Sequence, residues 1–218
     1  MNRCLSLGCL AIASFSAHAA LAFDAFNNFG PGDTYDTTTA YNIAGTDMDA
    51  PLFLPQHIAG SRFTAEATGI LAVIRIALHD VFTPGFNQVD VRLHEANMAG
   101  ELGPIMQAFT RSGLPPSGGA DPPETLTSFD PDVVLTAGNM YWIVVAPGDS
   151  STEASWNWSL SGEGDRFAES FNGGLTYSYR EARRGAMRIE VISIPEPATL
   201  ATLAVGVVGL ALWRRYRR

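Results

Sequence analysis

Apolar and polar side chains alternate along much of the chain between residues 23 and 194, and almost no segment repeats with the period of a helix. The clearest case is Gln88–Glu95, where Val89, Val91 and Leu93 occupy every second position and the residues between them are polar. Successive side chains of a strand point to opposite faces of a sheet. This segment therefore predicts a strand with one buried face and one solvated face.

A longer segment, Gly69–His79, is apolar on both faces and predicts a central strand. Glycine, proline, asparagine and aspartate separate further apolar stretches, as expected of turns. These stretches predict strands at Ser61–Ala65, Leu126–Phe129, Met140–Ala146, Ser155–Ser161, Leu175–Arg180 and Ala186–Ile194. About eight strands without helical periodicity predict an all-β domain, built as an antiparallel β-sandwich. The segment Ala108–Pro123 is rich in proline and glycine and predicts an exposed loop.

Residues 1–22 have the organisation of a secretory signal peptide. Arg3 supplies a positive charge, Cys4–Phe15 is the apolar core, and small residues precede the cleavage site. Cleavage after Ala22 would leave Phe23 as the first residue, and cleavage after Ala19 fits nearly as well. The chain is therefore predicted to be exported by the Sec machinery, with residues 23–194 as a single extracellular domain.

Residues 195–218 form a tail of three parts. Pro195, Glu196 and Pro197 come first, and the apolar stretch 198–213 predicts a transmembrane helix. These 16 residues span about 24 Å at roughly 1.5 Å per residue, which is short for a hydrocarbon core of about 30 Å. The tail ends in a basic cluster predicted to stay in the cytoplasm: Arg214, Arg215, Arg217 and Arg218.

This order of a Pro-Glu-Pro element, an apolar stretch and arginines resembles the PEP-CTERM sorting signal of Gram-negative bacteria that make extracellular polysaccharide. The resemblance implies a partner, the membrane-embedded protease exosortase, which recognises the Pro-Glu-Pro element and removes the segment after it. The tail would then anchor the chain in the inner membrane transiently, before delivery to the cell surface or the extracellular space. A permanent single-pass anchor is the alternative interpretation.

Composition removes several classes of function. Cys4 and Cys9 are the only cysteines, and both lie in the predicted signal peptide. The mature chain would have no thiol for a disulfide, a zinc site or a nucleophile. Residues 23–194 contain 21 acidic residues and 9 arginines without lysine, a formal charge of 9 minus 21, or −12. This acidity disfavours nucleic acid and anionic glycans as electrostatic partners.

Five motifs of the middle region also resemble a domain that recurs before varied surface anchors in bacteria, the choice-of-anchor group. They are Phe29–Asp36, Val91–Glu95, Leu135–Trp142, Trp156–Trp158 and Arg188–Val191. The resemblance covers most of residues 29–194. It implies a jelly-roll-like sandwich and brings no assigned reaction with it.

Two tryptophans are the candidate binding residues. Trp156 and Trp158 are two positions apart in a predicted strand, so their rings lie on the same face of the sheet. An exposed pair would form a platform for stacking on sugars, whereas an inward pair would belong to the core. Core packing is the interpretation favoured for large aromatic residues in strands. Tyr177 and Tyr179 allow the same two interpretations.

No catalytic or metal site is predicted. His57, His79 and His94 lack the spacing of a helical zinc motif, and no Gly-x-Ser-x-Gly elbow occurs. Asp47 and Asp49 offer oxygen ligands for calcium but lack the glutamate that completes a calcium loop, so solvated turn residues are the favoured interpretation. No cofactor is implied.

The sequence therefore predicts an exported, non-enzymatic structural or adhesive module of the cell surface or extracellular matrix, associated with exopolysaccharide. Two alternatives stay open. The first is a carbohydrate-binding module that uses the two tryptophans. The second is a secreted glycan hydrolase, which would need two carboxylates at a separation that the sequence does not define.

Overall fold

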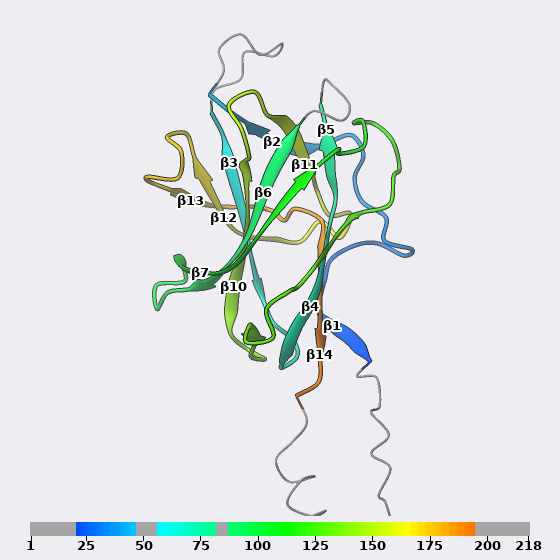
Figure 1. Ribbon diagram of the computed structural model, residues 1–218, viewed down its shortest axis with the longest axis vertical. Coiled ribbons are helices and arrows are strands. Elements are labelled where there is room, and N and C mark those ends of the chain that lie inside the picture. The colour runs from blue at the N-terminus through cyan, green and yellow to red at the C-terminus, as the bar shows by residue number, and fades with distance from the viewer. Residues whose placement is uncertain (1–20, 47–55, 82–86, 195–218) are drawn as a thin grey trace, which may run out of the picture.

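The computed structural model describes residues 21–46, 56–81 and 87–194, which form fourteen β-strands and no helix (Figure 1). Within these ranges, therefore, no helix has the length and apolar character needed to cross a membrane. The predicted tail lies wholly outside the described residues, as does the signal peptide apart from its last two positions. The all-β, antiparallel prediction is confirmed for the described part of the chain.

A six-stranded antiparallel sheet forms one layer of the domain. Its strands, in spatial order, are β13 (Ser178–Arg183), β12 (Gly164–Ser170), β3 (Ile58–Thr64), β10 (Met140–Pro147), β6 (Gln88–Ala96) and β7 (Leu102–Ser112). The aromatic and β-branched strand β10 lies inside the sheet, where Ile143 is paired with Ser61 on one side and with Leu93 on the other.

Two smaller sheets lie opposite the six-stranded sheet. One contains β1 (Ala22–Asn27), β14 (Met187–Ile192), β4 (Gly69–Ile76) and β8 (Glu124–Thr127), with β9 (Val134–Leu135) also paired to β4. The other contains β2 (Ala40–Ala44), β11 (Glu153–Asn157) and β5 (Leu78–Asp80). Figure 1 shows the three-stranded sheet at the end of the domain opposite the one where β1 begins and β14 ends.

The segment predicted as one strand, Gly69–His79, is divided between these two sheets. The strand β4 ends at Ile76, and β5 begins at Leu78. Ala77 between them donates its N–H to Ala186 at 3.2 Å and accepts a hydrogen bond from the Asn157 N–H at 2.9 Å. The single-strand prediction was therefore wrong at Ala77, where the backbone passes from one ladder to the next.

The predicted alternation of faces along this segment also fails, because β4 contains a bulge. Val73 is paired with Glu190 and Leu71 with Val191, which leaves Ala72 without a position in the ladder. An extra residue changes the face to which all earlier side chains point. Leu71 therefore reaches the core together with Ile74, although the sequence places them on opposite faces.

One hydrophobic cluster joins all three sheets and makes the arrangement a sandwich. The six-stranded sheet contributes Phe63 and Ile143, the five-stranded sheet contributes Ile74 and Ile189, and the three-stranded sheet contributes Trp156. These side chains are fully buried. Every described strand lies between residues 22 and 192, so residues 23–194 contain the sandwich except for the first residue of β1.

A second, smaller cluster covers the outer face of the six-stranded sheet. Trp142 and Val144 lie there fully buried beneath Tyr177 and Tyr179, which are only partly exposed. The rings of Trp142 and Tyr179 are 5.8 Å apart in an edge-to-face arrangement. The two tyrosines therefore pack on protein and do not form an exposed platform.

The predicted loop Ala108–Pro123 is partly strand. Residues 108–112 belong to β7, which is eleven residues long, and Leu114 is buried in the core. Pro116 forms a bridge with Asp80 at the end of the three-stranded sheet. The prediction was wrong for the first five residues because the edge strand β7 buries few of its side chains, so its apolar signal is weak.

Candidate functional site

The two ends of the described domain lie side by side. Strands β1 and β14 are antiparallel, with Ala22 paired to Ile192 and Asn27 paired to Arg188. Both ends therefore leave the sandwich at the same end (Figure 1). Ile194, the last described residue, follows β14 by two positions, so the sandwich closes immediately before the predicted tail. The tail residues themselves, Pro195 to Arg218, lie outside the described residues.

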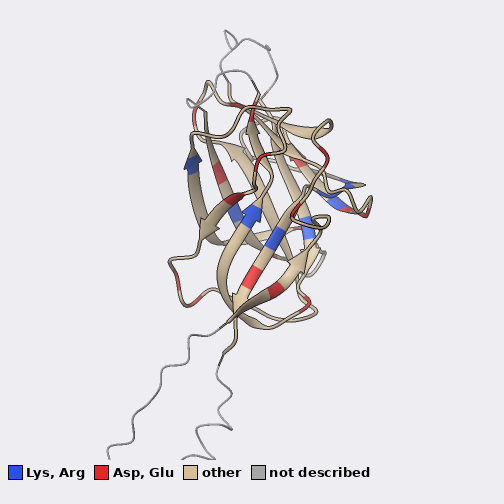
Figure 2. Cartoon of the chain, turned by 90° about the vertical axis from the view of Figure 1, so that its right-hand side faces the viewer, with Lys and Arg blue, Asp and Glu red and all other residues tan. Residues whose placement is uncertain are grey.

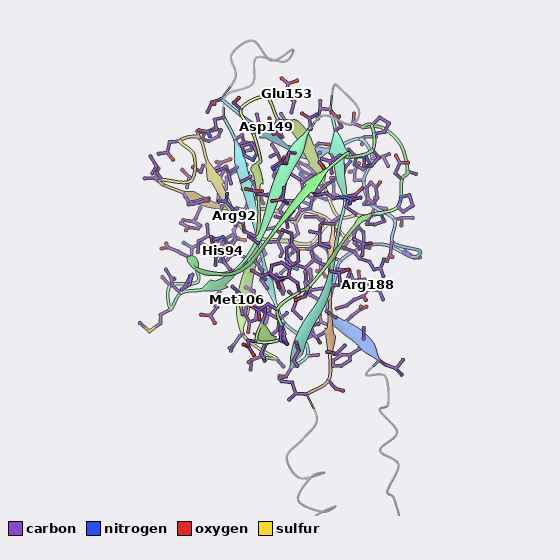
Figure 3. All side chains as sticks on the ribbon, viewed as in Figure 1. Arg92, His94, Met106, Asp149, Glu153 and Arg188 are labelled. Carbon is purple, nitrogen blue, oxygen red and sulfur yellow. The ribbon has the colours of Figure 1, made fainter. Side chains whose placement is uncertain are left out.

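Arg188, near the start of β14, ties this strand to β1 and to the loop that follows β1. Its Nε lies 2.6 Å from Asp24 Oδ1 of β1, and its Nη1 lies 3.2 Å from Asp33 Oδ1 of the following loop. The hydrogen bond to Asp24 raises the pKa of Arg188 above its usual value. Figure 3 labels Arg188 well below Glu153, which lies at the upper end of the domain in this view.

Charged side chains of both signs are interspersed over the strands and loops (Figure 2). Each of the nine arginines in the described part of the chain lies within 4.0 Å of a carboxylate oxygen. Each of these arginines therefore has an acidic neighbour, as expected in a domain with more carboxylates than arginines. A broad basic surface for an anionic polymer is absent from the described residues.

The tryptophan pair does not form a solvent-facing platform. Trp156 is fully buried, and its indole N–H donates to the Ala186 carbonyl at 3.1 Å. Trp158 is partly buried against the same core. Both rings pack against Tyr41, with centroids 6.5 and 5.5 Å away, so they do share a face. That face points inward, and only Trp158 reaches a hollow open to solvent.

The hollow beside Trp158 has a volume of about 390 Å³ and lies along the three-stranded sheet. We call it the Trp158 groove. Four segments that are distant in the sequence line it: Thr37, Thr38, Thr39, Ala40 and Asn42; Val81; Ser117; and Ser155, Asn157 and Trp158. Its polar groups are hydroxyls and amides. The sequence signal that could have identified it is the run Thr37–Thr39, which the strand pattern left without a role.

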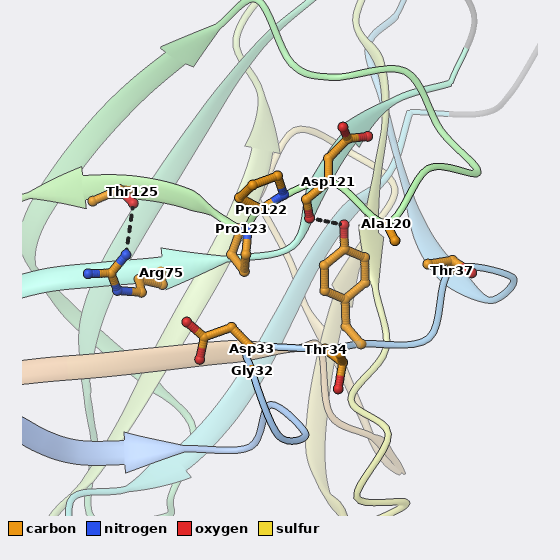
Figure 4. A pocket seen from close by; sticks show the side chains of 11 residues that line it. Gly32, Asp33, Thr34, Thr37, Arg75, Ala120, Asp121, Pro122, Pro123 and Thr125 are labelled. Atoms are coloured by element: carbon orange, nitrogen blue, oxygen red, sulfur yellow. Dashed lines mark hydrogen bonds between the residues drawn. The ribbon is translucent and has the colours of Figure 1, made fainter.

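A second hollow, of about 340 Å³, adjoins the groove at Thr37 (Figure 4). The Tyr35 hydroxyl donates to the Asp121 carbonyl at 2.6 Å beside it, and Arg75 donates to Thr125 at 3.4 Å on its far side. Burial and the Asp121 carboxylate raise the pKa of Tyr35 to about 12, so this phenol remains protonated at neutral pH.

A third hollow, of about 320 Å³, lies between the turns at residues 95–98 and 138–141.

A buried chain of hydrogen bonds connects the floors of the first two hollows. The Tyr35 hydroxyl lies 3.0 Å from His79 Nε2, and His79 Nδ1 lies 2.8 Å from Asn157 Oδ1. The Asn157 amide then donates to the Asp36 carbonyl at 2.7 Å. His79 and Asn157 are almost inaccessible to solvent. These contacts fix the floor of the Trp158 groove by using both polar atoms of the Asn157 side chain.

Asp36 organises the wall of the groove. Its carboxylate accepts hydrogen bonds from the hydroxyls of Thr38 at 2.7 Å and Thr39 at 2.5 Å, and from both of their backbone N–H groups. Arg183 approaches the same carboxylate at 3.3 Å. The hydroxyl of Thr39, followed by that of Thr38, lowers the pKa of Asp36 from 3.8 to about 2.

Removal of this carboxylate is expected to change the acid stability of the domain. Because the folded-state pKa of Asp36 lies below its unfolded value, ionised Asp36 stabilises the fold above about pH 4, and this stabilisation is lost as the pH falls towards 2. Asp36→Asn should therefore lower the free energy of unfolding at neutral pH, and its difference from wild type should shrink between about pH 4 and 2. Urea denaturation across this range measures both quantities.

Asp132→Asn is the matched control, because Asp132 is exposed and its carboxylate accepts no hydrogen bond from the described residues. A difference between wild type and Asp36→Asn that is as large at pH 2 as at pH 6 would contradict the assignment.

The three histidines do not converge on one site. His57 is bridged to Ala44, His79 lies in β5 and His94 in β6. His94 Nδ1 contacts the Gly103 carbonyl at 2.9 Å. Burial lowers the pKa of His57 and that of His94, so both stay neutral at physiological pH. No group of three metal-binding side chains occurs among the described residues. The positions considered for calcium, Asp47 and Asp49, lie outside them.

Two carboxylates are buried at the end of the domain away from the tail. Asp80 is paired with Ala154 in the ladder between β5 and β11, and the next residue, Val81, donates its N–H to the Glu153 carbonyl at 3.0 Å. Asn87 donates its side-chain amide to Asp80 and accepts the Glu153 N–H at 3.1 Å. Both carboxylates are nearly inaccessible, at 1% and 3% exposure, and neither lines the Trp158 groove.

The segment after the sandwich matches a protein-family model, described as the PEP-CTERM protein-sorting motif, over residues 193–218. The chain carries a PEP-CTERM sorting motif. This confirms the resemblance predicted from Pro195, Glu196 and Pro197. The PEP-CTERM motif marks an exported protein that passes through a membrane-anchored stage and is processed by an exosortase. No curated protein matches the chain. The choice-of-anchor resemblance of residues 29–194 stays a prediction.

Proposed function

We propose that this PEP-CTERM protein is a structural or adhesive module of the cell surface or extracellular matrix, associated with exopolysaccharide and without enzymatic activity. The observation that carries the proposal is the sorting motif at residues 193–218, which begins directly after the last strand of the sandwich. Cleavage beside Pro195–Pro197 would release a domain that keeps all fourteen described strands, so the sandwich is the part delivered outside.

The position of the tail supports a defined orientation during anchoring. Because β1 begins where β14 ends, both termini of the domain face the membrane while the tail is embedded. The three-stranded sheet, along which the Trp158 groove lies, is then at the end of the domain away from the membrane (Figure 1). The anchored intermediate would thus present this sheet, and not its two termini, to the outside of the cell.

The proposed export and sorting route can be tested in two strains, one with an exosortase and an otherwise identical one without it. With the protease present, we expect the chain to appear in the surface and exopolysaccharide fractions without its tail. Without the protease, we expect the tail-bearing form in the inner membrane. Cell fractionation with mass spectrometry of the C-terminus measures both forms. Full-length chain in the cytosol, with both terminal segments intact, would overturn the proposal.

A further inference from the structure

We propose that the Trp158 groove is a binding site for an uncharged saccharide. Its volume of about 390 Å³ falls in the range of about 300–1,000 Å³ that is usual for small-molecule sites. One wall of the groove is aromatic. The polar side chains of its lining are hydroxyls and amides. Three properties of the groove support this proposal: its lining is uncharged, several of its polar groups are uncommitted, and its walls are fixed.

The neutral lining is unusual for this domain. Residues 23–194 carry a formal charge of −12, yet none of the ten lining residues is charged. An anionic ligand would meet the negative field of the domain without a cation in the groove to receive it. A cationic ligand would find no carboxylate lining the groove. The lining therefore selects for an uncharged ligand.

Several polar groups of the lining have no partner within the described part of the chain. The side chains of Thr37, Asn42, Ser117 and Ser155 make no hydrogen bond to any described residue. A wholly apolar ligand would displace water from these groups without offering them new hydrogen bonds. Each group left unpaired in this way would cost binding free energy. Hydroxyls and amides both donate and accept, which matches the hydroxyl groups of a sugar.

The aromatic wall is held in place from two sides. Tyr41 lies against the Trp158 ring with a centroid distance of 5.5 Å, and the Arg183 guanidinium lies 5.6 Å from the ring centroid. The backbone is fixed as well, because Trp158 donates its N–H to the Thr39 carbonyl at 3.1 Å and accepts the Asp36 N–H at 2.9 Å. The part of the indole that lines the groove therefore adds a fixed apolar surface to it.

A fixed groove lowers the entropic cost of binding. The Asp36 carboxylate holds Thr38 and Thr39 on one wall, and Asn157 is held on the floor by His79 and the Asp36 carbonyl. A ligand would not need to order these side chains, so more of its contact energy contributes to affinity. The groove can thus bind a ligand of limited contact area.

The proposal is tested with the purified 23–194 fragment and neutral hexasaccharides of glucose, mannose and galactose, using isothermal titration calorimetry and tryptophan fluorescence. We expect at least one hexasaccharide to bind. Thr37→Val and Asn42→Ala should each weaken this binding about threefold to tenfold, the effect of one lost hydrogen bond. Both variants change exposed or half-exposed positions, and thermal unfolding verifies that they fold.

Thr64→Val is the matched control, because Thr64 is exposed on the six-stranded sheet and does not line the groove. It should bind as wild type does. A galacturonate hexasaccharide of equal length should bind more weakly than the neutral ligand. Absence of binding by every neutral hexasaccharide would overturn the proposal, as would unchanged affinity in both groove variants or equal affinity for the uronate. None of these outcomes affects the sorting route, because the fragment lacks the tail.

Discussion

Replacing Glu196 with alanine is expected to leave the exported chain attached to its C-terminal segment and retained in the inner membrane. The matched motif contains one carboxylate, and it stands between two prolines, a residue type that disfavours helical backbone. A single charge flanked by prolines is a suitable recognition element for a protease, and loss of the charge would remove its polar contact. Fractionation and mass spectrometry of the mature C-terminus should show wild type cleaved and almost all of the variant uncleaved.

The control for this experiment is Asp132→Ala, which removes an exposed carboxylate from a loop of the sandwich and should be cleaved as wild type is. Pro195→Ala and Pro197→Ala test the backbone part of the argument and should each slow cleavage. Equal processing of wild type and Glu196→Ala would show that the carboxylate does not take part. Uncleaved wild-type protein in an exosortase-containing strain would identify the tail as a permanent anchor.

Trp156→Ala is expected to cost the sandwich about 3–5 kcal/mol of unfolding free energy, the range measured when a large buried aromatic side chain is removed. The ring is fully buried, and its N–H is bonded to the Ala186 carbonyl. The backbone of Gly185 packs so closely on the ring that a Cβ there would overlap it. The cavity therefore cannot be filled without movement of the surrounding strands. Guanidinium denaturation of the 23–194 fragment measures the loss.

Trp158→Ala provides the comparison, because it removes the same side chain from a position that is only partly buried. Its cost in stability should be clearly smaller than that of Trp156→Ala. The two variants thus separate the structural ring from the ring that lines the groove. A cost for Trp156→Ala below about 1 kcal/mol, the typical effect of an average substitution, would contradict the core assignment.

Strong alternation along the sequence predicted several strands closely. The predicted strands Gln88–Glu95 and Met140–Ala146 differ from β6 and β10 by one residue at one end. Both lie inside the six-stranded sheet, where partners on either side bury their apolar residues. Burial on this scale requires a consistent pattern of side chains, so the pattern was sufficient to find them.

Strands with a weaker pattern were not predicted. The strand β12 (Gly164–Ser170) has two consecutive buried residues, Phe167 and Ala168, among polar positions, and β2 (Ala40–Ala44) is only five residues long. Each of these strands has a partner that is far away in the sequence. Phe167, for example, is paired with Ser61 and stacks on Tyr41 at 4.1 Å. Propensity alone does not reveal such contacts.

The sequence by itself determined the sorting tail, the absence of a thiol between residues 23 and 194, and the all-β class, because hydropathy, charge order and strand alternation are local properties of a chain. Only the tertiary structure decided that Trp156 lies inside, that Ala72 shifts the faces of β4, and that four distant segments form the Trp158 groove. These features depend on which strands pair and in which register. Pairing is set by long-range burial, which no local pattern encodes.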